Sequence, residues 1–222
     1  MKKFSFKQFI VPNLWKKVCF MLPAVLMMGF FVSILIEIGW GTDPASFMNL
    51  NISKVLHWSI GNTAVLVYGI MFVFTFIFGP EVIGFGSLAN MILIGYVVDI
   101  CQWVWEKTGF HALVINASFF QTVVIFIIAL LAFVIVASIY MNAQLGLSPY
   151  DAIPKILSGW WSKFPFSVLR IIYDLTAVAL GVLFGLLSSE GIQGSPLGAV
   201  IMAILLGPFI TIVGKPLEKI LR

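Results

Sequence analysis

The sequence predicts an all-α integral membrane protein that crosses the bilayer six times. Hydrophobic residues make up 61% of the chain and charged residues only 10%, whereas soluble domains carry about 25% charged residues. The mean hydropathy is +1.08, and six apolar stretches reach the length of about 20 residues that a spanning helix needs. An internal repeat divides these stretches into two groups of three. We therefore treat residues 1–222 as a single membrane domain.

The six predicted spans follow one another with short connections between them. They cover about residues 18–39, 62–80, 85–105, 118–141, 165–188 and 194–214. Residues 1–17 are basic, and the apolar run that follows is long enough to span and has no small-residue cleavage site. We therefore expect the first span to stay in the protein as an anchor and not to be removed as a signal peptide.

The chain contains an internal repeat with a step of 105 residues. Gly41-Thr42-Asp43-Pro44 follows the first span, and Gly146-Leu147-Ser148-Pro149 follows the fourth. The same step pairs further residues: Ser33 with Ser138, Glu37 with Asn142, Ser53 with Ser158 and Tyr68 with Tyr173. The two copies cover about residues 18–105 and 118–214. Since each copy holds three spans, the second must insert upside down, and inverted repeats of this kind are typical of alternating-access transporters.

A short capped helix is predicted after the first span of each copy. Residues 44–58 and 149–162 are too short and too polar to cross a bilayer. Asp43 and Ser148 are good N-cap residues, and each precedes a proline, which is favoured at the first helical position. Two placements remain open. Each helix either lies along its membrane interface, or it dips into the protein so that two partly positive helix N-termini face the interior.

The distribution of basic residues predicts the orientation. Ten cations fall on one side of the membrane if the spans alternate: Lys2, Lys3, Lys7, Lys16, Lys17, Lys155, Lys163, Lys215, Lys219 and Arg222. Lys54 and Lys107 fall on the other side. The positive-inside rule then places both termini in the cytoplasm. We expect the cations of that face to contact anionic lipid and not nucleic acid.

Four ionisable residues within the predicted spans are candidates for contact with a solute or a coupling ion: Glu37, Asp99, Arg170 and Asp174. A charge at a helix centre costs about 2.5–3.5 kcal/mol, so it needs a partner or a wet environment. Arg170 and Asp174 are spaced at i and i+4, which permits an internal salt bridge or a joint contact with a solute. Their repeat mates are Val65 and Gly69, so the pair also breaks the internal symmetry.

A polar stripe precedes each glycine break. Glu37 and Asn142 occupy equivalent positions, and Ser33 and Ser138 lie one turn earlier. These residues either line an interior that spans one and four share, or they join neighbouring helices by hydrogen bonds. Asp99 has the same two interpretations, a site or helix packing.

Sequence patterns for catalysis, cofactors and metals are absent. His57 and His111 fall in predicted loops, and no pair of His, Cys or carboxylate residues has metal-ligand spacing. Gly84-Phe85-Gly86 lacks the preceding strand and the following lysine of a phosphate-binding loop. Cys19 and Cys101 fall at opposite predicted faces, so we expect no disulfide. The sequence therefore predicts no enzymatic activity, no cofactor and no metal site.

The glycine motifs resemble those of the bacterial YczE/YyaS/YitT group of membrane proteins. The resemblance rests on Gly41-Thr42-Asp43-Pro44, Ser59-Ile60-Gly61, Leu93-Ile94-Gly95 and Leu205-Leu206-Gly207-Pro208-Phe209. Members similar to YitT usually carry a soluble C-terminal domain, and this sequence ends at Arg222 without one, so it looks more similar to the shorter YczE branch. The resemblance implies a multi-pass architecture in the bacterial cytoplasmic (inner) membrane and brings no catalytic residue with it.

These observations favour a secondary transporter or exporter of a small solute. The candidate residues of a central site, at which the two helix starts would meet, are Glu37, Asp43, Asp99, Asn142, Ser148, Arg170 and Asp174. If the helix N-termini converge there, an anionic solute is favoured. The alternative is a membrane scaffold or accessory subunit that stabilises a partner, in which case the polar positions serve packing. A homo-oligomer is compatible with either function.

Overall fold

The structure, a computed structural model, describes the backbone of residues 6–221 and the side chains of residues 8–216. Within this part, six helices are long and apolar enough to cross a membrane, which confirms the six predicted spans. They are α1 (Leu14–Ile38), α3 (Ile60–Phe78), α4 (Phe85–Thr108), α6 (Phe119–Asn142), α8 (Phe166–Leu187) and α9 (Pro196–Leu221). Some of the cations used above for orientation have side chains outside the described residues: Lys2, Lys3, Lys7, Lys219 and Arg222.

Shorter helices connect the long ones: η1 (Phe6–Phe9), α2 (Pro44–Leu56), η2 (Pro80–Val82), α5 (Phe110–Ile115) and α7 (Pro149–Trp160). α2 and α7 occupy the two segments for which the sequence predicts short helices. α5 lies in the connection between the third and fourth spans, where the sequence predicts no helix. It arises because Gly109, with a φ of +75°, ends α4 and lets the chain start a new turn.

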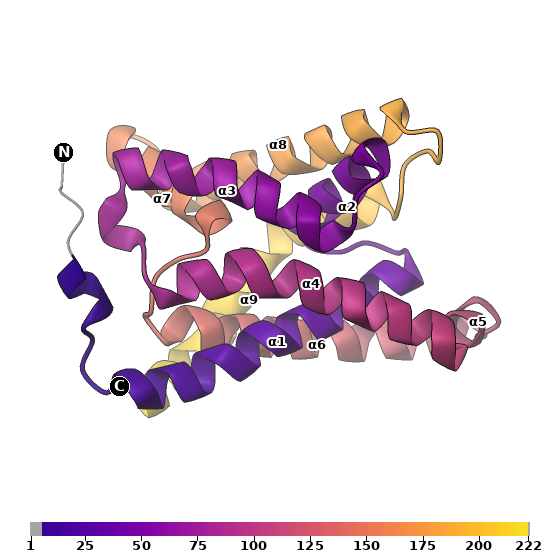
Figure 1. Ribbon diagram of the computed structural model, residues 1–222, viewed down its shortest axis with the longest axis horizontal. Helices are drawn as coiled ribbons and strands as arrows, with labels where there is room; N and C mark the ends of the chain where they lie inside the picture. Colours follow the sequence, from indigo (N-terminus) through magenta and orange to yellow (C-terminus); the bar gives the residue numbers. More distant parts are fainter. Residues whose placement is uncertain (1–5, 222) are drawn as a thin grey trace.

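The long helices run between two ends of an elongated bundle (Figure 1). We call the end that holds η1 and the last turns of α9 the terminal end, and the other the opposite end; these are left and right in Figure 1. α1 runs to the opposite end, and the chain then returns into the bundle before α2 begins. α6 runs to the terminal end, and the chain returns in the same manner before α7 begins. The first turns of both short helices therefore lie inside the bundle.

Helices of the two halves pack in matching pairs. α1 packs against α4 as α6 packs against α9, and α1 and α6 pack against each other. The short helices cross between the halves, because α2 packs against α8 and α7 packs against α3. The largest hydrophobic core lies among α1, α4, α6 and α9, and its buried residues include Val25, Val32, Val98, Phe133 and Tyr140.

α2 is enclosed by the protein. Phe47 and Asn51 are 0% exposed. The Asn51 amide donates to the Phe47 carbonyl (2.9 Å) and the Gln193 carbonyl (3.1 Å), and its oxygen accepts from the Gln193 backbone N–H (2.8 Å). These bonds satisfy a buried amide and tie α2 to the loop before α9. A helix along the membrane interface would leave one face uncovered, so this burial favours the placement within the protein.

Close backbone contacts hold the two loops that return into the bundle. Gly41 (φ +135°) lies against Gly198 at the start of α9, where a Cβ added at Gly198 would be 1.9 Å from the carbonyl oxygen of the residue before Gly41. Gly146 (φ +102°) lies against Gly84 at the start of α4, where a Cβ added at Gly84 would be 2.2 Å from the carbonyl oxygen of the residue before Gly146. Glycine permits both the positive φ and the close approach.

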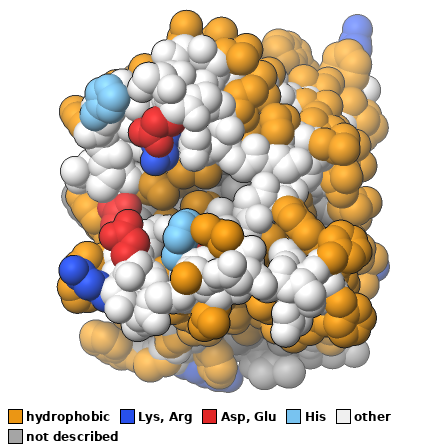
Figure 2. Space-filling model, turned by 90° about the vertical axis from the view of Figure 1, so that its right-hand side faces the viewer, with side chains coloured by type: hydrophobic (Ala, Val, Ile, Leu, Met, Phe, Trp, Pro, Cys, Tyr) orange, Lys and Arg blue, Asp and Glu red, His pale blue; other side chains and the backbone are white. Residues whose placement is uncertain are grey.

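Few cations lie at the opposite end of the bundle, which faces the viewer in Figure 2. In the described part of the chain, Lys54 and Lys107 belong to segments that end there, and Lys54 pairs with Glu190 at 2.8 Å. The described cations in segments at the terminal end are Lys16, Lys17, Lys155, Lys163 and Lys215. The helix directions therefore separate the cations as the alternation of spans predicts.

Candidate functional site

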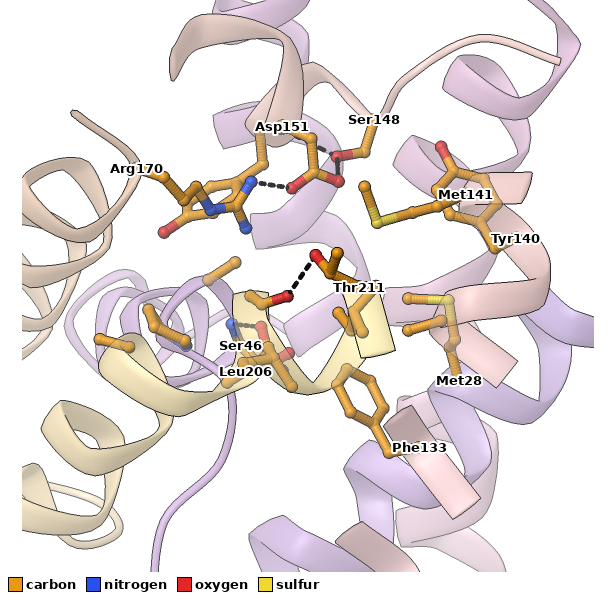
Figure 3. Close-up of a pocket in the computed structure, with 18 of the residues that line it drawn as sticks. Met28, Ser46, Phe133, Tyr140, Met141, Ser148, Asp151, Arg170, Leu206 and Thr211 are labelled. Carbon is orange, nitrogen blue, oxygen red and sulfur yellow. Dashed lines mark hydrogen bonds and ion pairs between the residues drawn. The ribbon is translucent and has the colours of Figure 1, made fainter. Parts of the chain in front are cut away.

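A cavity of about 440 Å³ lies between the first turns of α2 and α7 (Figure 3). Its wall also includes parts of all six long helices. In Figure 3, Ser148, Asp151 and Arg170 lie on one side of the cavity and Ser46 lies on the other. The volume falls within the range of about 300–1,000 Å³ that is typical of small-molecule sites.

Residues of α7 and α8 form a polar cluster on one side of the cavity. Ser148 is the N-cap of α7, and its hydroxyl accepts from the Asp151 backbone N–H (3.0 Å) and donates to Asp151 Oδ2 (2.6 Å). The other Asp151 oxygen forms an ion pair with Arg170 Nη1. The segment Ser148-Pro149-Tyr150-Asp151 folds this way because it combines a cap residue, a proline at the first helical position and an acid in the first turn.

Arg170 is held by a further pair of residues behind this cluster. Its Nε donates to Asp174 Oδ2 (2.9 Å), and the Tyr150 hydroxyl donates to Asp174 Oδ1 (2.7 Å). The guanidinium also lies over the Tyr150 ring, 5.4 Å from the ring centroid. Asp174 is 3% exposed, so the salt bridge that the i, i+4 spacing permits is formed in a buried setting. Arg170 therefore serves two carboxylates, those of Asp151 and Asp174.

α2 places one carboxylate on the other side of the cavity. Asp43 is the N-cap of α2, and its oxygens accept from the Ser46 backbone N–H (3.0 Å) and the Thr42 hydroxyl (3.3 Å). Asp43 is 9% exposed, and no cation among the described residues forms an ion pair with it. Burial raises the pKa of the Asp43 carboxyl above its ordinary value, because desolvation outweighs the hydrogen bonds. Asp43 therefore takes up a proton at a higher pH than an exposed aspartate does.

The rest of the wall is mostly apolar and aromatic. The members of this kind that Figure 3 labels are Met28, Phe133, Tyr140, Met141 and Leu206. Exposed residues of the wall include Met141 in the last turn of α6 and Phe166 in the first turn of α8. Both turns lie at the terminal end, and further exposed residues of the wall, Ile204 and Ile212, lie along α9.

The opposite end of the bundle is filled with packed residues. The backbone contact between Gly41 and Gly198 lies there, at the start of the first returning loop. The Trp40 ring packs against Phe119 and Phe126 of α6, at centroid distances of 5.6 and 5.8 Å. None of these five residues is in the described wall of the cavity. The described wall of the cavity therefore stops short of these contacts.

The seven sequence candidates are divided between the cavity and other places. Those in the wall are Asp43, Ser148 and Arg170. Those outside the wall are Glu37, Asp99, Asn142 and Asp174. Asp174 lies directly behind Arg170, as described above, so the structure brings four of the seven together.

The polar stripe before each glycine break serves contacts at the two ends of the bundle. Glu37, with a side chain that is 5% exposed, contacts the His111 ring of α5 at the opposite end. The Asn142 amide donates to the Ser138 carbonyl (2.9 Å) at the terminal end of α6. The Ser138 hydroxyl donates to the Ile210 carbonyl of α9 (3.1 Å). Glu37 and Asn142 lie far from each other because α1 and α6 run in opposite directions.

Asp99 caps the start of a helix instead of lining the cavity. Its two oxygens accept from the backbone N–H groups of Ile60 (3.0 Å) and Gly61 (2.9 Å) at the start of α3. α3 and α4 approach closely here, since a Cβ added at Gly95 would be 2.8 Å from the Gly61 Cα. This position matches the packing interpretation of Asp99.

Tyr150 and Asp151 are the site residues that the sequence reasoning does not find. Under the 105-residue step Asp151 falls on Ser46 and Tyr150 on Ala45, so the repeat draws no attention to them. The available signal for Asp151 is the Ser-x-x-acid pattern of a helix start, from Ser148 to Asp151. Its pairing with Arg170 depends on the packing of α7 against α8, which no local pattern indicates.

Fold and cavity together define a multi-pass, all-α membrane protein with an internal pocket. Residues 15–215 match the model of a family of unknown function, DUF6198, and the chain belongs to this family. No curated protein and no solved structure matches the chain. Because the function of this family is unknown, the activity has to be inferred from the cavity.

Proposed function

We propose that this protein is a secondary transporter or exporter of a small solute, which it carries by alternating access. The observation that supports this best is the cavity between the starts of two returning helices, with a charged cluster in its wall. At membrane depth, non-helical backbone is tolerated only where protein buries it or where it lines a cavity. Charged residues within membrane proteins commonly mark a solute or ion pathway.

In this proposal the two halves of the chain form an inverted repeat, and the short helices are re-entrant. The crossed packing of α2 on α8 and of α7 on α3 supports it. Positions of positive φ also agree, because Gly39 and Gly41 in the first returning loop correspond to Gln144 and Gly146 in the second. Two units related in this way give a protein two equivalent states, one open to each side of the membrane.

The proposed orientation makes the present state inward-facing. The positive-inside rule assigns the terminal end to the cytoplasm, and the cavity wall extends to turns of α6 and α8 at that end. An outward-facing state requires the packed residues at the opposite end to separate, where the loop at Gly41 meets the start of α9. The resemblance to the YczE branch belongs to the same proposal and rests on its glycine motifs.

A scaffold is the less favoured function. A protein that only stabilises a partner needs no internal cavity. Charged residues in the wall of such a cavity would destabilise the protein and serve no function. In this proposal the solute crosses the membrane unchanged, with no catalytic step. The protein requires the lipid bilayer and no partner protein.

Solute loss from vesicles tests the proposal. Liposomes with the purified protein are loaded with the small-molecule fraction of a bacterial extract, diluted into buffer and examined by untargeted mass spectrometry. We expect at least one solute to leave faster than from protein-free liposomes. Ser46→Trp fills the cavity and should reduce this loss to the protein-free rate, whereas Thr176→Trp, on an exposed face of α8, should not. Identical contents in all these liposomes would contradict transport.

A further inference from the structure

We propose that the solute of the cavity is a small organic cation, such as a protonated amine, and that the Asp43 carboxylate is its counter-charge. This inference rests on the proposed function and names its substrate class. It departs from the anionic solute that converging helix N-termini favour.

The charges of the wall favour a cation. Among the described residues of the wall, the charged groups are the carboxylates of Asp43 and Asp151 and the guanidinium of Arg170. Arg170 pairs with Asp151 and, behind the wall, with Asp174, so its charge is already compensated. Asp43 forms no ion pair with any cation that the structure describes. A buried carboxylate without a counter-ion is costly, and a cationic ligand removes that cost.

The two helix starts are already occupied by side chains of the protein. At α2, the Ser46 backbone N–H donates to Asp43. At α7, the Asp151 backbone N–H donates to Ser148, and the Asp151 carboxylate lies in the same turn. Acids at helix N-termini offset the partial positive charge there. An incoming anion would therefore meet two carboxylates, whereas an ammonium group would be attracted by them.

The remainder of the wall suits the apolar part of an amine. Aromatic rings of Tyr68, Phe133 and Tyr140 line it, and such rings attract cations through their faces. The sulfur atoms and methyl groups of Met28 and Met141 add polarizable apolar surface. The volume of about 440 Å³ admits a ligand with one ring and a short amine chain.

Asp43 also provides a way to couple the cation to a proton. The ionised carboxylate binds an ammonium group and the protonated one does not, so amine binding releases the carboxyl proton to water and proton binding releases the amine. Burial raises the pKa of Asp43, so this exchange occurs at a higher pH than for an exposed aspartate. The other titratable or charged groups of the wall are Tyr68, Tyr140, Tyr150, Asp151 and Arg170.

Three probes that share a phenyl ring test the inference by isothermal titration calorimetry on the purified protein: phenethylammonium, 3-phenylpropionate and 2-phenylethanol. We expect phenethylammonium to bind, with an affinity that falls as the pH is lowered through the Asp43 pKa. Below that pKa, binding should release about one proton, which buffers of different ionisation enthalpy reveal. Neither of the other probes should bind comparably.

Two variants isolate the charge of Asp43. Asp43→Asn and Asp43→Ser keep an N-cap side chain for α2, so both should remain folded by thermal unfolding. Each should weaken phenethylammonium binding by at least about 30-fold and abolish proton release. Glu190→Gln, which removes an exposed carboxylate paired with Lys54, should bind like the wild type.

Several results would overturn the inference: preferred binding of phenylpropionate, equal binding of the three probes, no binding of phenethylammonium, or unchanged affinity in Asp43→Asn. The vesicle experiment keeps the proposed function separate. If the wild-type vesicles lose an anionic or neutral solute and Ser46→Trp blocks that loss, the transport proposal is supported and the inference of a cationic solute is wrong. If no solute is lost from any vesicle, transport and the cation inference both fall.

Discussion

Arg170→Ala is expected to lower the free energy of unfolding by about 3–5 kcal/mol and to stop transport. For a chain of this size the corresponding fall in Tm is on the order of 10 °C. The substitution leaves Asp151 and Asp174 without their cation, and Asp174 is 3% exposed. A buried carboxylate that loses its partner is more costly than a pair that was never formed. Thermal unfolding in detergent measures the effect.

Two further variants separate the charge of Arg170 from its shape. Arg170→Lys keeps the charge, but a single ammonium group cannot reproduce the planar guanidinium that binds both carboxylates. We therefore expect a Tm between those of the wild type and Arg170→Ala. Combining Arg170→Met with Asp151→Asn and Asp174→Asn removes every charge of the cluster and should recover most of the lost stability without restoring transport. A wild-type Tm for Arg170→Ala would show that the cluster does not stabilise the fold.

Gly198→Ala is expected to destabilise the protein by about 1–3 kcal/mol or more and to impair transport. The added Cβ would lie 1.9 Å from the Trp40 carbonyl oxygen, and no rotamer change can relieve a clash with backbone. Gly84→Ala creates a matching clash, 2.2 Å from the Leu145 carbonyl oxygen. Because these contacts hold the returning loops, relief of the clash displaces the first turns of α2 and α7. The Tm in detergent and solute loss from vesicles measure the two effects.

Gly69→Ala and Gly159→Ala are matched controls outside the described cavity wall, because a Cβ added at either position meets no atom within 4 Å. Both glycines lie inside helices, where alanine is favoured over glycine by roughly 0.5–1 kcal/mol. We therefore expect an unchanged or slightly higher Tm. If all four glycine variants unfold at the same temperature, the returning loops adjust freely and their contacts do not set the geometry of the cavity.

The spans and the short helices could be predicted because their signals are local. Hydropathy over about 20 residues reports a span without knowledge of its neighbours. The pairs Asp43-Pro44 and Ser148-Pro149 mark helix starts, and in the structure Asp43 and Ser148 accept from the backbone N–H groups of the first turn. α5 has no comparable signal, since it is a single short helix that depends on the left-handed turn at Gly109.

The site could be predicted only in part, because it depends on how the chain returns into the bundle. Asp43 and Ser148 reach the cavity since each begins a returning helix. Glu37 lies only six residues before Asp43, yet it stays at the end of α1 with His111 while the loop carries Asp43 inward. Asp151 reaches Arg170 through helix packing, which neither hydropathy nor the repeat encodes.

The central claim is that the cavity faces each side of the membrane in turn, and thiol labelling of oriented vesicles tests it most directly. The background carries alanine in place of Cys19 and Cys101, which are free. Ser46→Cys then places one thiol in the cavity wall. A membrane-impermeant reagent is added to one side of the vesicles and, in a parallel sample, to the other.

Three positions report whether the labelling is valid. Lys163→Cys at the terminal end and Asn116→Cys at the opposite end are exposed and should each react from one side only. Ser33→Cys, at a position that is 0% exposed and outside the cavity, should react from neither. The account predicts that Ser46→Cys reacts from both sides. Reaction from one side only, with the three controls as expected, would contradict alternating access through this cavity.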